Sequence, residues 1–301
     1  MNFNEFTQCI KSAVTAKCDS SMKIEIRQVL KNNSLNLTGI VMCGENENAA
    51  PAIYLENCYD DYMKGRSIDE IADDIIYMYD HYKGKCPVDI ESFLLYDNIK
   101  DRILYKVINK SRNMLLLENI PHRDILDLSI VFYCCIGEFD DGNIATALIY
   151  NEHMSMWEVD EEELYSVASQ NMRIRQPYKI INFGDLIKEL SGEKITEEAD
   201  MYVVTSSNKL YGACWAFDDE VITRLYEQFG DFYILPSSIH EVIIVPEKDT
   251  VEGKYLVEMV ESVNETQLSA EEILSDSVYL YRGINNEFLI LNNINEGCTN
   301  A

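Results

Sequence analysis

The sequence has few histidines, few basic residues and no long apolar runs, and these shortages exclude several classes of protein. Histidine occurs four times in 301 residues, and lysine and arginine together occur 25 times against 52 aspartates and glutamates. The longest apolar runs, such as residues 130–136, are far shorter than the roughly 20 residues that a membrane-spanning helix requires. An acid stands near the N-terminus where a secretory signal would carry bases. We therefore expect a soluble, cytoplasmic protein with no membrane partner.

Motifs for bound cofactors are also missing. No Gly-x-Gly-x-x-Gly sequence occurs, so the phosphate-binding turn of dinucleotide-binding proteins is not expected. His240 and Glu241 begin like the helix of a zinc protease, but the second histidine would fall at position 244, which is Ile244. Most of the nine cysteines lie in apolar segments, where a reduced cysteine acts as a small hydrophobic residue. The sequence thus predicts no metal, no other cofactor and a reducing compartment.

The net charge of −27 is the most unusual property of the chain. Residues 1–150 hold 23 acids and 15 bases, and residues 151–301 hold 29 acids and 10 bases. Such a field repels nucleic acid and anionic membranes, and it attracts basic molecules. We therefore expect no direct binding to nucleic acid, and a partner that is another protein, with a basic protein favoured by the charge. The alternative is that the acids serve solubility alone.

Apolar periodicity and turn signals predict helices and strands over most of the chain. Ser67 and Glu70 have the spacing of a capping box, in which two side chains and two backbone amides at a helix start bond reciprocally. Ser269 and Glu272 repeat this spacing and predict a short helix late in the chain. Helices are expected over 3–17, 68–82 and 161–171, and strands over 23–30, 35–43, 103–109, 125–136, 143–150, 278–281 and 287–291.

The clearest predicted unit lies near residues 201–245 and has the order ββαββ. Its strands are expected over 201–205, 210–217, 232–235 and 239–245, around a helix from Asp218 to Gly230. Because strands and helices do not alternate regularly, we expect an α+β fold with antiparallel-rich sheets and helices packed on one face.

The domain organisation is less clearly marked in the sequence, because no linker of low complexity occurs. A division near residues 112–122 gives an N-terminal α+β region (1–118), a C-terminal α+β region with the ββαββ unit (119–292) and a frayed tail (293–301). One continuous domain is the alternative.

Ser238 and His240 are candidate catalytic residues, with Glu241 beside them. On an extended strand both would point to the same face, and a hydroxyl beside an imidazole can support nucleophilic catalysis. No Gly-x-Ser-x-Gly motif surrounds either serine of this segment. The alternative is a turn in which serines cap backbone amides while His240 bonds to a neighbouring loop.

Two further features are candidates for binding. His122 and Arg123 lie in a polar segment that enters a strand, where they could bind an anion, a solvated loop being the alternative. Six of the 19 tyrosines lie between residues 54 and 82. Tyrosine combines a large contact area with a polar tip, which suits interfaces, and core packing with hydroxyls in water is the alternative.

Several stretches resemble an uncharacterised bacterial family, common in clostridia, that is known only as a domain of unknown function. The residues that carry the resemblance are Ala50–Leu55, Ile120–Asp124, Met201–Thr205, Tyr211–Ala213 and Tyr233–Glu241. The order of these segments is also similar, more distantly, to another uncharacterised family found in bacilli. The resemblance implies a bacterial, cytoplasmic protein and brings no catalytic residue, substrate or cofactor.

Three functions are consistent with these observations. The first is a non-enzymatic binding or regulatory protein, since every catalytic and metal motif fails while acids and tyrosines are abundant. The second is an acidic nucleic-acid mimic that inhibits a DNA- or RNA-binding enzyme, as phage or anti-defence proteins do. The third is a hydrolase that uses Ser238 and His240.

Overall fold

The computed structural model describes residues 1–44, 52–83, 90–138, 144–191, 200–236, 238–248 and 252–292. The tail expected to be frayed, 293–301, lies outside the described residues.

Internal contacts divide the chain into two compact units. Unit 1 comprises residues 1–99 and 135–147, and unit 2 comprises residues 100–134 and 148–301. Neither unit is one continuous stretch of sequence. The division after residue 118 that the sequence suggested stays a prediction, because contacts alone do not establish which segments fold by themselves.

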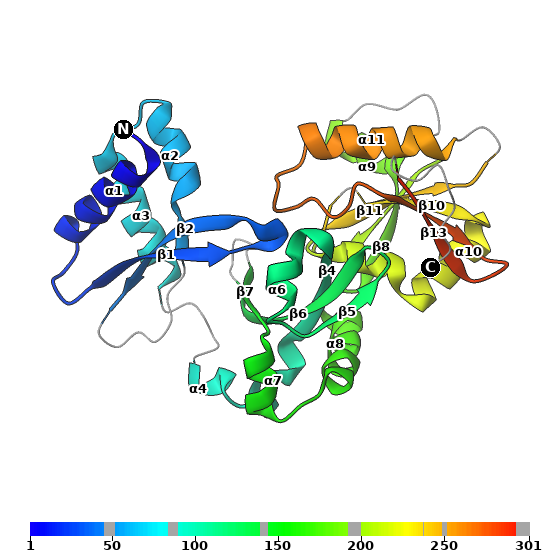
Figure 1. The fold of residues 1–301 in the computed structure, drawn as a ribbon, viewed down its shortest axis with the longest axis horizontal. Helices are drawn as coiled ribbons and strands as arrows, with labels where there is room; N and C mark the ends of the chain where they lie inside the picture. The colour runs from blue at the N-terminus through cyan, green and yellow to red at the C-terminus, as the bar shows by residue number, and fades with distance from the viewer. Residues whose placement is uncertain are drawn as a thin grey trace. The chain divides into compact units, whose positions relative to one another are not determined.

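Unit 1 contains a three-stranded antiparallel sheet with helices against one face (Figure 1). Ile26 of the first strand stands opposite Ile40 of the second, and both pack against the helices. Glu25 and Arg27 alternate with Ile26 and form an ion pair of 2.7 Å on the other face. The elements are α1 (Phe3–Lys17), β1 (Lys23–Leu30), η1 (Asn32–Ser34), β2 (Asn36–Cys43), β3 (Ala52–Tyr54), α2 (Leu55–Met63), α3 (Ile68–Tyr82), α4 (Ile90–Phe93) and α5 (Tyr96–Ile99).

The helices of unit 1 begin where local sequence signals place them. The capping box at Ser67 is confirmed, since the Ser67 amide donates to Glu70 Oε2 at 2.9 Å and the Glu70 amide donates to Ser67 Oγ at 3.3 Å. Asn2 and Glu5 form a second box at the start of α1, with both hydrogen bonds within 3.0 Å. The helix predicted over 3–17 is confirmed with both of its ends.

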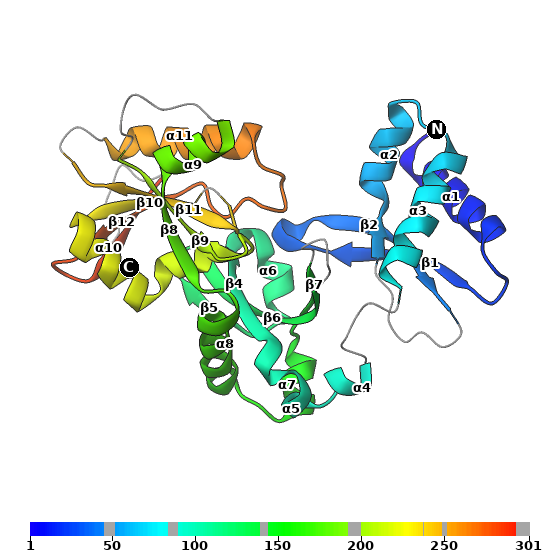
Figure 2. The same ribbon diagram turned by 180° about the vertical axis from the view of Figure 1, so that it is seen from behind.

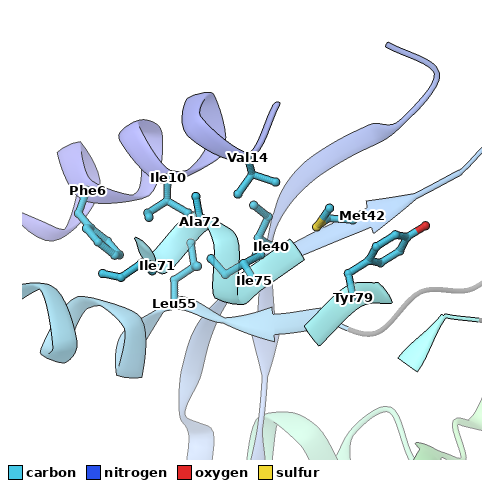
Figure 3. Close-up of a cluster of buried hydrophobic side chains, with 10 residues drawn as sticks. All are labelled: Phe6, Ile10, Val14, Ile40, Met42, Leu55, Ile71, Ala72, Ile75 and Tyr79. Atoms are coloured by element: carbon cyan, nitrogen blue, oxygen red, sulfur yellow. The ribbon is translucent and has the colours of Figure 1, made fainter. Parts of the chain in front are cut away.

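The core of unit 1 lies between the helices and the sheet, as Figure 3 shows. Side chains spaced by three or four residues on α1 meet a similar stripe on α3, which is the packing expected of two amphipathic helices. The buried cluster consists of Phe6, Ile10, Val14, Ile40, Met42, Leu55, Ile71, Ala72, Ile75 and Tyr79.

The first half of unit 2 is built around residues 128–134 of β6, with β4 and β5 antiparallel on either side of them. Strand β7 also pairs with β6, and residues 135–138 of β6 and 144–147 of β7 belong to unit 1. The single strand predicted over 125–136 is two strands, because Leu126 has a φ of 56° and turns the chain at Leu126-Asp127. Helix α8 lies against β4. The elements are η2 (Lys100–Arg102), β4 (Ile103–Asn109), η3 (Ser111–Asn113), α6 (Met114–Leu117), β5 (His122–Ile125), β6 (Leu128–Glu138), β7 (Ile144–Leu148), α7 (Asn151–Trp157) and α8 (Glu161–Arg175).

The second half of unit 2 is a six-stranded sheet in the order β13-β12-β10-β11-β9-β8, with every pair antiparallel. Helices α9 and α11 lie on one side of it in both views (Figures 1 and 2). The elements are β8 (Tyr178–Asn182), α9 (Phe183–Ser191), β9 (Tyr202–Ser206), η4 (Gly212–Phe217), α10 (Asp219–Phe229), β10 (Phe232–Leu235), β11 (Glu241–Pro246), α11 (Gly253–Thr266), β12 (Val278–Arg282) and β13 (Glu287–Leu291).

Strand β12 shows that both faces of this sheet are covered. Val278 and Leu280 belong to the apolar cluster that includes α11. Tyr279 points the other way and meets Phe217 of η4, with ring centroids 5.8 Å apart. Tyr281 similarly meets Tyr226 of α10 at 6.0 Å. The expected α+β class with antiparallel sheets is confirmed, and this sheet carries helical elements on two faces.

The ββαββ prediction needs one correction. The segment Leu210–Phe217, expected as the second strand, contains the 3-10 helix η4 instead. A continuous apolar run fits a buried helix as well as a buried strand, and here small residues decide between them. A Cβ on Gly212 would lie 2.1 Å from the amide nitrogen of Ser206, so only glycine lets η4 approach the end of β9 this closely.

The late capping box needs a second correction. The Ser269 amide donates to Glu272 Oε2 at 3.4 Å, as a box requires, but the Glu272 amide donates to the Ser269 carbonyl instead of its hydroxyl, and no helix follows. The carbonyl of Glu272 instead accepts the amide of Ile239 at 2.9 Å, which ties this segment to the one before β11. The helix of this region is α11, which precedes the box and begins without a side-chain cap.

Candidate functional site

Ser238 and His240 lie in a turn ahead of β11, because that strand begins only at Glu241. The amide of His240 donates to Ser238 Oγ at 3.0 Å, and Ser238 is buried. The hydroxyl of Thr205 donates to the His240 carbonyl at 2.9 Å. This is the arrangement of the structural alternative, in which a serine caps a backbone amide at a turn.

The His240 ring also forms a hydrogen bond with a backbone amide. Its Nδ1 accepts the amide of Tyr211 at 3.2 Å, so the proton of the neutral ring lies on Nε2, which faces Glu272 Oε1 at 3.8 Å. Burial lowers the pKa of His240, and the Glu272 carboxylate opposes that shift. The ring thus accepts a hydrogen bond at Nδ1 from the residue that precedes η4.

Tyr211 is the residue of this cluster that sequence reasoning missed. Its ring stacks on His240 with centroids 5.4 Å apart and planes 13° apart, and the Lys106 ammonium lies 4.2 Å from its centroid. Tyr133 meets the same ring edge-on at 5.2 Å. Tyr211 has a φ of 55°, a conformation that the expected strand would not contain. The sequence does not predict this turn at Tyr211, and the turn places the Tyr211 ring against His240 and Lys106.

Glu241 lies beside this cluster at the start of β11. Burial raises the pKa of its carboxyl group, and Lys209 opposes the shift. Ser238, His240 and Glu241 are thus adjacent in the chain, but the hydrogen bonds of Ser238 and His240 go to backbone groups.

His122 and Arg123 lie on β5 and not in a solvated loop. Arg123 forms ion pairs with Glu161 and, at 2.7 Å, with Glu162, and its guanidinium lies 4.1 Å from the ring centroid of Tyr165. His122 Nδ1 donates to the carbonyl of Ile120 at 3.0 Å. An anion at Arg123 would have to displace two carboxylates of α8.

Unit 1 contains a pocket of about 410 Å³ between β3, α2 and α3. Its walls are mainly apolar. Arg66 also lines the pocket, together with the two carboxylates to which it is paired. Arg66 Nη2 lies 2.7 Å from Asp74 Oδ2, and Arg66 Nη1 lies 3.4 Å from Asp61 Oδ2. The concentration of tyrosines over residues 54–82 was a sequence signal at this place, and Tyr54 and Tyr82 do line the pocket.

Surface charge is distributed unequally between acids and bases. At least eleven described lysines and arginines form ion pairs, and five of these, Lys17, Arg66, Arg123, Arg173 and Arg282, each bind two carboxylates. Other acids are exposed and have no cation in ion-pair distance within the described ranges. They include Asp60, Asp80, Asp219, Glu227, Glu258 and Glu265.

Two absences hold for the part of the chain that the structure describes. No three histidine, cysteine, aspartate or glutamate side chains gather there as ligands for a metal ion. No helix there is both long enough and apolar enough to cross a membrane.

Comparison with known proteins gives a family and no function. No curated protein matches the chain, and no solved structure matches it. A family model described as "Family of unknown function (DUF5688)" matches residues 3–283, so the resemblance to a domain of unknown function is confirmed. Because the match covers nearly the whole sequence, the chain belongs to the DUF5688 family.

Proposed function

We propose that the chain is a non-enzymatic binding protein of the bacterial cytoplasm and that its partner is a basic protein. The distribution of surface charge supports this most directly. At least eleven of the 25 bases are neutralised in ion pairs, five of them by two acids each, while exposed acids on α2, α3, α10 and α11 have no cation within ion-pair distance among the described residues. The resulting negative field attracts a basic surface and repels acidic ones.

The binding energy of such a pair depends on salt. Exposed charges are screened beyond a Debye length of about 10 Å at 0.1 M salt and about 3 Å at 1 M. A partner held by the acidic surface should therefore associate quickly at low salt and be released at high salt. A partner held by apolar contacts would stay bound under both conditions.

The proposal is tested by capture on the immobilised full-length chain from a lysate of its native host, at 0.05 M and 1 M salt. We expect basic proteins that bind at low salt and elute at high salt. A variant in which the six unpaired acids named above become the corresponding amides should capture at least tenfold less of them. Capture that is unaffected by this variant would contradict the proposal.

The same experiment separates the nucleic-acid mimic from a general binding protein. If the captured proteins are DNA- or RNA-binding enzymes and duplex DNA competes for them, the acids imitate phosphates. If DNA does not compete, the binding surface of the partner is not its nucleic-acid site.

A further inference from the structure

We infer that the pocket of unit 1 binds a short segment of the basic partner, in which a lysine or arginine side chain stands beside an apolar one. This inference rests on the proposed function and assigns to it a specific site. It follows from the shape of the pocket, the chemistry of its walls and the charges at its lining.

The pocket is large enough for a ligand and has apolar walls. Its volume of about 410 Å³ lies within the range of roughly 300–1,000 Å³ that ligand pockets occupy. Ile53, Ile71 and Met78 provide aliphatic and thioether surface, and Tyr54 and Tyr82 provide two aromatic rings. The aliphatic stem of a long basic side chain can lie on such a surface while its charged head reaches a polar rim.

The charged part of the lining is suited to a cation. Arg66 is already bonded to Asp61 and Asp74, so the three groups carry a net charge of −1. Side chains of both acids remain about half exposed, 44% for Asp61 and 55% for Asp74, and can accept further hydrogen bonds. Lys64 lies 3.9 Å from Asp61, beyond hydrogen-bond distance, and is 76% exposed, so water screens its charge. An anion at Arg66 would face both carboxylates.

The surroundings of the pocket have the same sign. Unit 1 holds 19 acidic and nine basic residues. Inside the pocket, burial raises the pKa of the Cys58 thiol, and Asp61 and Asp74 raise it further. A poorly hydrated wall under a negative potential favours a cation with an apolar stem over either a simple ion or a neutral apolar group.

The test uses the full chain with isotope-labelled isoleucine and methionine methyl groups, observed by NMR. The probe is the blocked dipeptide N-acetyl-Leu-Arg-amide, compared with its citrulline analogue, which has the same shape without the charge, and with its glutamate analogue. We expect saturable shifts of the methyl groups of Ile53, Ile71 and Met78 with the arginine peptide. The citrulline peptide should bind at least fivefold more weakly, and the glutamate peptide should give no saturable shift.

A pair of double variants isolates the role of the two carboxylates. Asp61→Asn with Asp74→Asn removes the acids of the pocket, whereas Asp60→Asn with Asp80→Asn makes the same charge change on the same two helices outside its lining. The pocket variant should lose at least tenfold in affinity for the arginine peptide, and the matched control at most twofold. Unchanged methyl signals of the core residues Ile10 and Ile40 would establish that both variants are folded.

Several outcomes would overturn the inference. These are equal binding of the citrulline peptide, tighter binding of the glutamate peptide, equal losses in the two double variants, or shifts confined to methyl groups outside the pocket. The peptide measurement needs no partner, so it is independent of capture. If salt-sensitive capture persists while the peptide fails to bind, the pocket is excluded as the binding site and the proposed function stands. If the peptide binds while capture fails, the pocket is a site for basic peptides and the proposed function is rejected.

Discussion

Tyr279 donates its hydroxyl to Asp127 Oδ1 at 2.7 Å, although 152 residues separate them in the sequence. The tyrosine is fully buried on β12, and the aspartate lies in the turn between β5 and β6. Ser275 and Ser277 donate to the other oxygen of Asp127 at 2.7 and 3.2 Å. One carboxylate therefore links the two sheets of unit 2.

The first prediction concerns this link. Tyr279→Phe removes one hydrogen bond to a charged group, which contributes about 1.5–3 kcal/mol, so the free energy of unfolding should fall by about that amount. Asp127→Ala should cost more, because it leaves three hydroxyl groups without their acceptor. Urea unfolding of both variants measures the difference. A loss below about 0.5 kcal/mol for Tyr279→Phe would show that water replaces the bond.

The second prediction concerns the close approach at Gly212. A Cβ there would meet the backbone of β9 at 2.1 Å, and backbone cannot move aside as a flexible side chain can. Gly212→Ala should therefore destabilise unit 2 by about 3 kcal/mol or more. Gly230→Ala is the control, because Gly230 has a φ of 72° and a ψ of −144° with nothing near its Cβ, so it should cost only backbone strain, about 1–3 kcal/mol. Equal losses for the two variants would contradict the packing argument.

The third prediction is a pH dependence that arises at His240. Burial lowers its pKa in the folded chain below the value of about 6.5 in the unfolded chain. The unfolded state then binds more protons between these two pKa values, so stability is complete above about pH 6.5 and falls as the pH decreases through that window. Burial lowers the pKa of His153 as well, so two residues contribute.

Unfolding curves between pH 5 and 8 measure this slope. His240→Gln should flatten it, because glutamine has no proton to gain, and His153→Gln should remove a separate share. A slope that neither substitution changes would assign the pH dependence to carboxyl groups instead.

The fourth prediction distinguishes stacking from charge at Arg123. Arg123→Lys keeps the positive charge for Glu161 and Glu162 but loses the planar contact with Tyr165. We expect a loss of about 1 kcal/mol in the free energy of unfolding at both low and high salt. If the loss appears only at low salt, the ion pairs account for the role of Arg123 and the ring does not.

Local signals in the sequence predicted the elements that depend on local interactions. The cap at Ser67, the amphipathic face of α1 and strand β10 are all where they were expected, since each rests on residues within a few positions. Helix α11 was missed because it begins without a side-chain cap. Segment 210–217 was misassigned because the close packing that Gly212 permits against β9 is tertiary.

The candidate site could be predicted only in part, for the same physical reason. The sequence was consistent with two arrangements of Ser238 and His240. The amide that donates a hydrogen bond to the His240 ring belongs to Tyr211, which lies 29 residues away in the sequence. The pocket of unit 1 needs Arg66 to bridge a residue of α2 and one of α3, which no spacing rule predicts. Neutralisation of bases by paired acids is likewise visible only in three dimensions.

The path of the chain between the two units has a consequence for inheritance. The chain passes from one unit to the other after residues 99, 134 and 147. Any single break point between residues 99 and 148 thus divides at least one unit between two gene fragments. Recombination at one point therefore cannot separate the two units and leave both of them whole, so we expect the two units to be inherited together.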